Sequence, residues 1–418
     1  MNIAMFSVHT CPLAALGGKE TGGMNVYVRE LSRELARRGH RVDIFTRSQD
    51  PDVPHIEWDG LGLGADVLHI PAGPEAPYNK HHLFNYLPEF VHGVQEFMDT
   101  ERIHYDVYHA HYWLSGWVAR ELQNCQRAPV VQMFHTLGVL KNAVARGQAD
   151  REAENRINVE REIMRFADRV VAATPRDRQQ MIDLYDAPQD RIAIIPPGVD
   201  LGLFHPIPLV EAKEFVESPL DHHTILFVGR IDPIKGIDVW FQAMALIVQE
   251  NPELREKMCV CLIGGDVDEE TPRDAEMARL QSLKDELGIG DVVTFLGKRA
   301  QQCLPYYYSA ADVVVMPSRY ESFGMVALEA MACGVPVVAS DVGGLSFVVR
   351  DGETGYLVPE GNPRALADCL GYLIRNPGLR VHLGRKAQQV ASEYAWPRIA
   401  DQVEELYITL AAERQAAR

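Results

Sequence analysis

The chain has 418 residues, which is too long for one ordinary hydrophobic core and predicts two domains. Its formal net charge of −17 argues against a nucleic-acid or anionic-membrane partner, because either partner would require a basic face. The seven cysteines are scattered without a Cys-x-x-Cys pair, and no apolar run approaches the ~20 residues of a membrane span. We therefore expect a cytoplasmic protein with reduced cysteines.

The first half of the chain alternates strand-like and helix-like segments. Strands are predicted, in chain order, at 2–8, 42–46, 67–70, 107–110, 130–134, 169–173 and 192–195. Helices are predicted at 25–38, 90–98 and 156–166. Apolar strands separated by helices predict a parallel sheet with helices on both faces.

The second half repeats this alternation after an irregular stretch. Residues 201–223 lack clean periodicity and contain three prolines, so we expect a linker there. Further strands are predicted at 225–228, 260–263, 292–296, 313–316 and 337–339, followed by a hairpin-like segment at 355–358. The pattern predicts a second α/β domain of similar size, with a cleft between the two doubly wound domains.

The segment from Glu321 to Glu329 places two carboxylates eight residues apart around Gly324. Glu329 falls inside an apolar helical pattern and is expected to be poorly solvated, whereas Glu321 lies in the loop before the helix. The backbone N–H groups of Gly324, Met325 and Val326 would point at an anion or a polar sugar above the helix N-terminus. The loop follows an apolar strand, where open α/β sheets bind ligands. The alternative is a helix start with a stray buried glutamate.

A glycine-rich loop, Gly17-Gly18-Lys19-Glu20-Thr21-Gly22-Gly23, joins the first strand to the first helix. Paired glycines let backbone N–H groups approach a phosphate closely. The loop lacks the GKS/T ending of a P-loop and is not a G-x-G-x-x-G motif, so neither nucleoside triphosphate hydrolysis nor hydride transfer is indicated. A flexible turn is the alternative interpretation.

Cations and histidines follow other predicted strands. Arg230 can grip two phosphate oxygens with its planar guanidinium, and Lys235, five residues later, adds a point charge. His135 follows the strand at 130–134, where a structural role is the alternative to a catalytic one. His109 and His111 have a spacing that could suit a metal, but no third ligand is evident nearby, so no metal site is predicted. The Asp266-Val-Asp268 segment is expected to be a polar loop.

Together, Arg230 with Lys235, Glu321 with Glu329, and the Gly22-Gly23 loop resemble the retaining family 4 glycosyltransferases of GT-B fold, over essentially the whole chain. The resemblance implies two Rossmann-like domains facing a central cleft. Residues 1–200 would form the N-terminal acceptor-binding domain, and residues 201–399 the C-terminal nucleotide-sugar-binding domain. The helix at about 400–418 would pack back on the first domain.

The resemblance also implies roles for single residues. Those matching Arg230 and Lys235 bind the donor diphosphate, Glu329 holds the ribose hydroxyls, and Glu321 and His135 lie beside the donor sugar. The implied catalytic residues are His135, Arg230, Lys235 and Glu321. The implied donor site comprises Gly23, Arg230, Lys235, Arg299, Glu321, Phe323, Gly324, Met325, Val326 and Glu329.

Motifs in the first half are similar to one branch of this family, the enzymes that glycosylate inositol 3-phosphate. The motifs are His9-Thr-Cys-Pro-Leu13, Gly22-Gly-Met-Asn-Val-Tyr27, His111-Tyr-Trp-Leu-Ser-Gly116 and His135-Thr-Leu137. In that branch, residues matching Lys80, Tyr112, Thr136 and Arg156 bind the acceptor phosphate, and Asn25 completes the implied acceptor site.

The bacterial sucrose-phosphate synthases are the close rival branch. The segment Tyr86-Leu-Pro-Glu-Phe-Val91 is similar to theirs, and they also bind a sugar phosphate with a basic pair. Met24, where sucrose-type enzymes usually have glutamine, favours the inositol branch. From spacing alone, Arg156 is better explained as one of several exposed helix charges, and the resemblance reverses that interpretation.

No carboxylate lies where a retaining nucleophile would be expected, so a front-face displacement is favoured over a covalent intermediate. The implied partners are a uridine or guanosine diphosphate sugar, with UDP-glucose or UDP-N-acetylglucosamine as the first choice, and a phosphorylated small-molecule acceptor. No cofactor is required on this scheme, and stimulation by Mg²⁺, as well as a monomer or a homodimer, stays open. The remaining alternatives are fructose 6-phosphate as acceptor and a non-catalytic sugar-nucleotide-binding protein.

Overall fold

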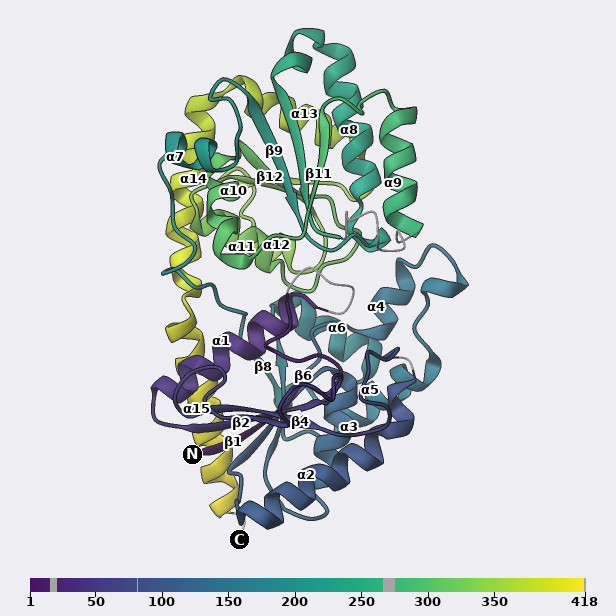
Figure 1. The fold of residues 1–418 in the computed structure, drawn as a ribbon, viewed down its shortest axis with the longest axis vertical. Helices are drawn as coiled ribbons and strands as arrows, with labels where there is room; N and C mark the ends of the chain where they lie inside the picture. The colour runs from purple at the N-terminus through teal and green to yellow at the C-terminus, as the bar shows by residue number, and fades with distance from the viewer. Residues whose placement is uncertain (16–20, 81, 266–274, 417–418) are drawn as a thin grey trace.

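The computed structural model describes residues 1–15, 21–80, 82–265 and 275–416, which form two α/β bodies stacked end to end (Figure 1). Residues 17–20 of the glycine-rich loop are outside the described residues, as is the Asp266-Val-Asp268 segment. Within the described ranges, no helix has the length and apolar character needed to cross a bilayer.

The N-terminal body is built on a sheet of parallel strands. Its strands are β1 (Asn2–Phe6), β2 (Arg41–Arg47), β3 (Ile56–Glu57), β4 (Ala65–Ile70), β5 (Val107–His111), β6 (Val130–Met133), β7 (Arg169–Ala172) and β8 (Ile192–Ile194). They lie in the order β3-β4-β2-β1-β5-β6-β7-β8, and only the β3–β4 pair is antiparallel. Its helices are α1 (Gly23–Arg37), α2 (Leu87–Glu101), α3 (Tyr112–Leu122), α4 (Gly138–Ala143), α5 (Glu154–Phe166) and α6 (Pro175–Tyr185).

The C-terminal body has a fully parallel sheet. Its strands are β9 (His223–Val228), β10 (Met258–Ile263), β11 (Val293–Gly297), β12 (Val313–Met316), β13 (Val337–Ser340) and β14 (Gly355–Val358), in the order β11-β10-β9-β12-β13-β14. Its helices are α7 (Leu209–Phe215), α8 (Ile237–Glu250), α9 (Ala275–Glu286), α10 (Leu304–Ala310), α11 (Met325–Ala332), α12 (Leu345–Val348), α13 (Pro363–Arg375) and α14 (Pro377–Ala391). The last helix is α15 (Trp396–Ala416), and short 3₁₀ helices occur at Leu83–Tyr86, Gln148–Asp150, Gln189–Arg191, Pro233–Lys235, Pro252–Lys257, Gln301–Cys303 and Ser392–Tyr394.

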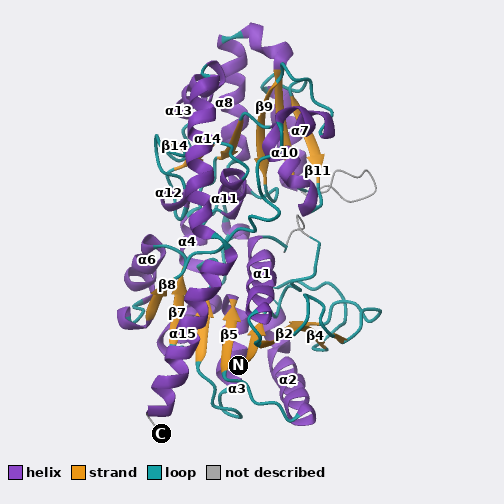
Figure 2. Cartoon of the chain, turned by 90° about the vertical axis from the view of Figure 1, so that its left-hand side faces the viewer, coloured by secondary structure: helices purple, strands orange, loops and turns teal. Residues whose placement is uncertain are grey.

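Both faces of each sheet are buried, which explains why most strands are rich in apolar residues. Strand β2 is an exception, because Asp43 and Arg47 are buried in it. In β1, Ile3 and Met5 join the core beneath α1, whereas Ala4 and Phe6 join the core on the opposite face with α2 and α3. Figure 2 shows the two sheets in separate upper and lower bodies with helices on either side. The predicted pair of doubly wound α/β domains is thus confirmed.

Two segments differ from the sequence prediction. The expected linker at 201–223 contains α7, which packs on α10 through the stacked rings of Phe215 and Tyr306, 4.1 Å apart. A seven-residue helix is too short to show clear periodicity in the sequence. The hairpin-like segment at 355–358 is instead β14, which pairs in parallel with β13. The connection between them contains α12, and parallel pairing requires such a crossover.

Helix α15 leaves the C-terminal body and runs along the N-terminal one (Figure 1). Arg38, which follows α1, contacts Asp401 and Glu404 at 2.6 and 2.9 Å, and Arg169 of β7 contacts Glu413 at 2.7 Å. These ion pairs attach the last helix to the N-terminal body. The domain boundary at residue 200 stays a prediction.

Candidate active site

Several of the predicted site residues follow strands at the points where the strand order of each sheet reverses. In the N-terminal sheet the reversal lies between β1 and β5, and in the C-terminal sheet it lies between β9 and β12. Open α/β sheets bind ligands in the crevice outside the carboxyl ends of strands at such points. After β1 and β5, Gly23 and Tyr112 begin helices α1 and α3, and the loops after β9 and β12 carry Arg230 and Glu321.

Two helix N-termini from opposite domains meet at this crevice. A Cβ atom on Gly23, the first residue of α1, would lie 3.2 Å from Sδ of Met325, the first residue of α11. Gly324 precedes α11 with φ of 103°, and a Cβ there would lie 2.7 Å from a methyl group of Leu345. Glycine is therefore needed at position 324. The free N–H groups at both helix starts favour a negatively charged ligand between them.

The strand-end cations differ in their surroundings. Nζ of Lys235 lies 2.5 Å from Oε2 of Glu321, and both side chains are less than one-fifth exposed. Arg230 is about one-third exposed, with Nη2 3.7 Å from Oδ2 of Asp232. The structure therefore pairs one of the predicted diphosphate-binding cations with the carboxylate predicted to face the donor sugar.

Arg299 and Phe323, two further residues of the predicted donor site, differ in their surroundings. Arg299 follows β11, and its Nε donates a hydrogen bond to the Tyr307 hydroxyl at 2.9 Å. Phe323 is buried and packs on Tyr394, with the ring centroids 6.0 Å apart. The side chain of Phe323 thus belongs to the core, so only its backbone can reach a ligand.

Glu329 is buried in α11, as the apolar pattern predicted. The hydroxyl of Tyr308 donates a hydrogen bond to its Oε2 at 2.8 Å. Burial raises the pKa of Glu329 to about 7, although the Tyr308 hydrogen bond and the charge of Arg29 act to lower it. The other carboxylate oxygen forms no hydrogen bond with a described residue, and Glu329 lines a small hollow that includes Val26 of the N-terminal domain. One oxygen is therefore available at the interface of the domains.

Three of the four predicted phosphate ligands converge. Arg156 is 2% exposed; its Nη1 donates to the Tyr112 hydroxyl at 2.9 Å, and its Nη2 donates to the carbonyl and hydroxyl oxygens of Thr136 at 2.8 and 3.1 Å. The guanidinium also lies 4.7 Å from the centroid of the Tyr112 ring. The interpretation of Arg156 as an exposed helix charge is wrong.

The charge of Arg156 is matched by two carboxylates that the sequence analysis did not select. Oε1 of Glu152 lies 2.9 Å from Nη1, and Oε1 of Glu160 lies 2.7 Å from Nε. Lys141 also pairs with Glu152. Burial acts to raise the pKa of Glu152, but Arg156 and Lys141 outweigh it and lower the pKa to about 2. The cluster is therefore close to neutral, and a phosphate dianion would need further positive charge from Lys80.

His9 is a further residue of this cluster. Its ring centroid lies 4.4 Å from that of Tyr112, and its Nδ1 is enclosed without a hydrogen-bond partner among the described residues. Burial lowers the pKa of His9, and the charges of Lys80 and Arg156 lower it further. The charges of Lys80 and Arg156 therefore both act on the His9 ring. His9 belongs to the His9–Leu13 motif named above, but nothing in the sequence indicated that its ring lies against Tyr112.

Asn25 is not free to bind an acceptor with its side chain. It is fully buried; its Nδ2 donates to the Thr10 hydroxyl and the Cys11 carbonyl, both at 2.7 Å, and its Oδ1 accepts from Gly22 N at 3.0 Å. The side chain therefore shapes the loop between β1 and α1. The donors and one lone pair of this side chain are used in that role, and its acceptor contact stays a prediction.

His135 lies beside the Arg156 cluster, in the turn that contains Thr136. Its backbone has φ of 60°, and Tyr112 has φ of 76°, so both strand ends adopt the left-handed conformation. Such conformations cluster at functional sites. Nε2 of His135 lies 3.1 Å from Nδ1 of His111. Among the described residues, no group of three His, Cys, Asp or Glu side chains could hold a metal ion.

The donor and acceptor loops touch through Tyr320, which precedes Glu321. Burial raises the pKa of the Tyr320 hydroxyl, while a hydrogen bond with the Leu137 backbone and the charge of Arg156 act to lower it. The Glu321 loop therefore lies against the turn that contains His135 and Thr136. This contact brings the two halves of the site to one place.

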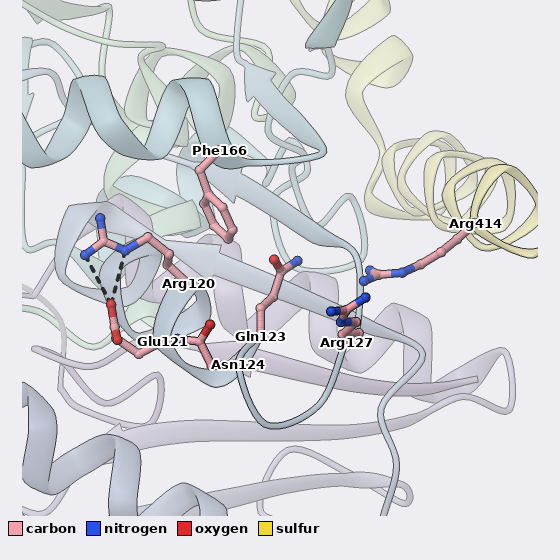
Figure 3. A pocket seen from close by; sticks show the side chains of 7 residues that line it. All are labelled: Arg120, Glu121, Gln123, Asn124, Arg127, Phe166 and Arg414. Carbon is pink, nitrogen blue, oxygen red and sulfur yellow. Dashed lines mark hydrogen bonds and ion pairs between the residues drawn. The ribbon is translucent and has the colours of Figure 1, made fainter. Parts of the chain in front are cut away.

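A separate surface hollow of about 500 Å³ lies outside this site (Figure 3). It is bordered by the end of α3, the segment before β6 and the end of α15, and Arg127 and Arg414 point toward one another across it. None of the residues predicted to bind donor or acceptor lines it. The full lining is Arg120, Glu121, Gln123, Asn124, Arg127, Phe166 and Arg414.

Comparisons with known proteins agree with this arrangement. The family of glycosyl transferases group 1 matches residues 211–390, and Glycosyltransferase Family 4 matches residues 21–203. The D-inositol 3-phosphate glycosyltransferases of Saccharomonospora viridis and Acidothermus cellulolyticus are each 40% identical to this chain. These matches cover 97% and 99% of this chain, and 93% and 92% of the two relatives.

Solved structures show the same similarity. The sucrose-phosphate synthase of Thermosynechococcus elongatus is 37% identical, with a TM-score of 0.90 over 99% of both chains. HepE of Anabaena in complex with UDP-glucose has a TM-score of 0.74 at 21% identity, over 98% of this chain and 100% of its own, which is a similarity of fold. The predicted GT-B architecture is confirmed. The chain belongs to glycosyltransferase family 4 and is an enzyme of this retaining hexosyltransferase type.

Proposed function

We propose that this enzyme transfers a hexosyl unit from UDP-glucose or UDP-N-acetylglucosamine to a phosphorylated acceptor, with inositol phosphate as the first choice. The observation that carries this proposal is the buried contact of Arg156 with Tyr112 and Thr136 beside the Glu321 loop. Arg156 already donates all its N–H groups within the protein, so it would supply positive charge and no direct hydrogen bond. The hydroxyl groups of Tyr112 and Thr136, together with Lys80, would bind the phosphate dianion. The names of the relatives, which specify inositol 3-phosphate, support the same acceptor.

On the donor side, the proposal assigns the diphosphate to Arg230, Lys235 and the N–H groups at the start of α11. Lys235 would exchange its contact with Glu321 for the phosphate, which would free the carboxylate to accept a hydrogen bond from the donor sugar. The unpaired oxygen of Glu329 would accept hydrogen bonds from the ribose. HepE, a structure of the same fold, binds UDP-glucose, which supports a nucleotide-sugar donor.

The chemistry follows from these positions. Negative charge grows on the leaving diphosphate, and the two cations with the helix N-termini would stabilise it in a site that excludes water. The departing phosphate oxygen would take the proton of the attacking acceptor hydroxyl on the same face of the sugar, so the anomeric configuration is retained. Holding donor and acceptor in contact supplies much of the remaining acceleration. We propose that no metal is required for this scheme, and that Mg²⁺ at most stimulates it.

The rival acceptor is fructose 6-phosphate, which a sucrose-phosphate synthase would use. The observation that favours it is the match with the Thermosynechococcus enzyme, whose sequence identity of 37% is close to that of the inositol-type relatives. A non-catalytic binding protein is disfavoured because both cations and both glutamates of the donor site are present.

A donor-by-acceptor grid tests the proposal. UDP-glucose, UDP-N-acetylglucosamine, GDP-mannose and ADP-glucose are each combined with inositol 3-phosphate, fructose 6-phosphate, free inositol and free fructose. We expect UDP to be released only with a uridine donor and a phosphorylated acceptor, and the product to retain its anomeric configuration by NMR. Equal turnover of free inositol or fructose would show that the assigned phosphate site is wrong. Repeating the assay with EDTA tests the proposed independence from metal.

Glu329→Gln should weaken UDP binding and flatten its dependence on pH. With a pKa of about 7, the parent carboxyl is protonated below this pH and charged above it. Because ribose hydroxyls donate more strongly to a carboxylate, parent affinity should rise as the pH increases from about 6 to about 8. Calorimetry at both pH values measures this change in affinity. The pH dependence that remains in Glu329→Gln comes from titration of the nucleotide phosphate itself. Equal affinities of parent and variant at about pH 8 would make Glu329 purely structural.

A further inference from the structure

Two buried histidines, His111 and His109, form a row that begins at His135. Nδ1 of His111 lies 3.1 Å from Nε2 of His135, and the ring centroid of His111 lies 4.3 Å from that of His109. Nδ1 of His109 lies 2.5 Å from the hydroxyl of Tyr407 on α15. His109, His111 and Tyr407 are all 0% exposed. The row thus joins the last helix to the turn that carries His135.

The contact between His111 and His135 admits only two proton arrangements. Burial lowers the pKa of both rings, so both are neutral at ordinary pH and each carries a single proton. A hydrogen bond at this distance needs one N–H and one lone pair. Either His111 donates from Nδ1, or His135 donates from Nε2.

The other nitrogen of His111 decides between these arrangements. Nε2 of His111 is enclosed and has no hydrogen-bond partner in the part of the chain that the structure describes. If His135 donated, His111 would have to carry its proton on this nitrogen, as a buried N–H without an acceptor. If His111 donates from Nδ1, the enclosed nitrogen is only a bare lone pair. Orphaned buried N–H groups are rarer in proteins than unsatisfied acceptors, so the second arrangement is favoured.

We infer that His111 is a positioning residue that holds His135 as its Nδ1–H tautomer. His135 then presents a neutral hydrogen-bond donor to the cleft, because its Nδ1 bonds to no described residue and is not among the enclosed nitrogens. In this state His135 orients an oxygen of the substrate and does not act as a proton acceptor. This inference rests on the proposed function, in which His135 lies beside the reacting sugar and the leaving phosphate takes the proton.

The geometry around the row favours a fixed orientation of the two rings. Tyr27 of α1 packs edge-on against both, with centroid distances of 5.5 Å to His111 and 5.3 Å to His135. The positive φ of His135 turns its side chain toward His111 from a strained strand end. A histidine tautomer is set by the hydrogen bond that its other nitrogen makes, and here His111 provides that bond.

Nitrogen-15 NMR of the histidine side chains in the full-length protein tests the tautomer directly. For the parent protein we expect a protonated Nδ1 and a bare Nε2 in His135, and a protonated Nδ1 in His111. Assignment comes from the resonances lost in His135→Gln and His111→Asn. A proton on Nε2 of His135 would overturn the inference. This measurement uses the free enzyme, so it stands even if the parent transfers no sugar and the proposed function fails.

Activity of two variants completes the test. His111→Phe removes the donor and should lower kcat by about tenfold, the factor that one neutral hydrogen bond supplies, with little change in the KM of the donor. His111→Asn keeps an N–H near the Nδ1 position and should restore most of this loss.

The matched control is Tyr108→Phe. Tyr108 lies on β5, as His111 does, but on the opposite face of the sheet, and the change removes its partly buried hydrogen bond to Gln126. Tyr108→Phe should lose about as much stability as His111→Phe but keep the kcat of the parent. Equal kcat values in parent and His111→Phe, or equal losses in His111→Phe and His111→Asn, would assign His111 a purely structural role.

Discussion

Lys235→Ala should raise the barrier measured by kcat/KM for the donor by about 1.5–3 kcal/mol, as expected for a lost charged hydrogen bond. Lys235 would neutralise charge on the leaving diphosphate, and it is held less than one-fifth exposed against Glu321, at 2.5 Å. Arg230→Ala should cause a loss of similar size. Arg230 is about one-third exposed, and its removal should barely affect folding. Steady-state kinetics with a varied uridine donor, together with UDP affinity by calorimetry, measure both variants.

Lys257→Ala is the matched control for Lys235→Ala. Lys257 is also paired with a carboxylate, Asp221 at 2.9 Å, but it lies more than half exposed before β10 and away from the cleft. Its replacement should leave kcat/KM unchanged, since exposed pairs contribute little. Unchanged kcat/KM in both Lys235→Ala and Arg230→Ala would show that the diphosphate binds elsewhere.

Arg156→Ala should both destabilise the protein and abolish use of a phosphorylated acceptor. The guanidinium is buried between Glu152 and Glu160, so its removal leaves two buried carboxylates without their cation. Breaking a buried ion pair from one side typically costs about 3–5 kcal/mol of unfolding free energy. Thermal denaturation measures this loss, and Arg156→Ala with Glu160→Gln should recover part of the stability but none of the acceptor binding.

Variants without this folding cost separate the acceptor role from the structural one. Tyr112→Phe removes only the hydroxyl that faces Arg156, and Lys80→Ala changes a half-buried loop residue. Each should lower kcat/KM for inositol 3-phosphate by about 10- to 100-fold, the range for a hydrogen bond to a charged group, and leave UDP affinity unchanged. If both variants kept the kinetics of the parent, the acceptor phosphate would not bind at this cluster.

The sequence by itself determined the class of fold and the loops that carry chemistry. Apolar strands separated by helices predicted both sheets, because strands covered on both faces are rich in apolar residues. Glu329 was predicted to be a poorly solvated acid for the same reason, since its neighbours in the helix are apolar. Gly324 was singled out, and its left-handed φ of 103° explains why a glycine stands there.

Only the tertiary structure decided how distant residues meet. From its spacing, Arg156 looked like one of several exposed charges on a helix. Nothing along the chain shows that Tyr112 and Thr136, which follow β5 and β6, contact it. The pairing of Lys235 with Glu321 and the line from Tyr407 to His135 likewise join segments far apart in sequence. Local patterns report which face of an element is buried, whereas the partner on that face is set by strand order and by the packing of α15. The sequence therefore predicted which residues follow the strands, but not which of these residues contact one another.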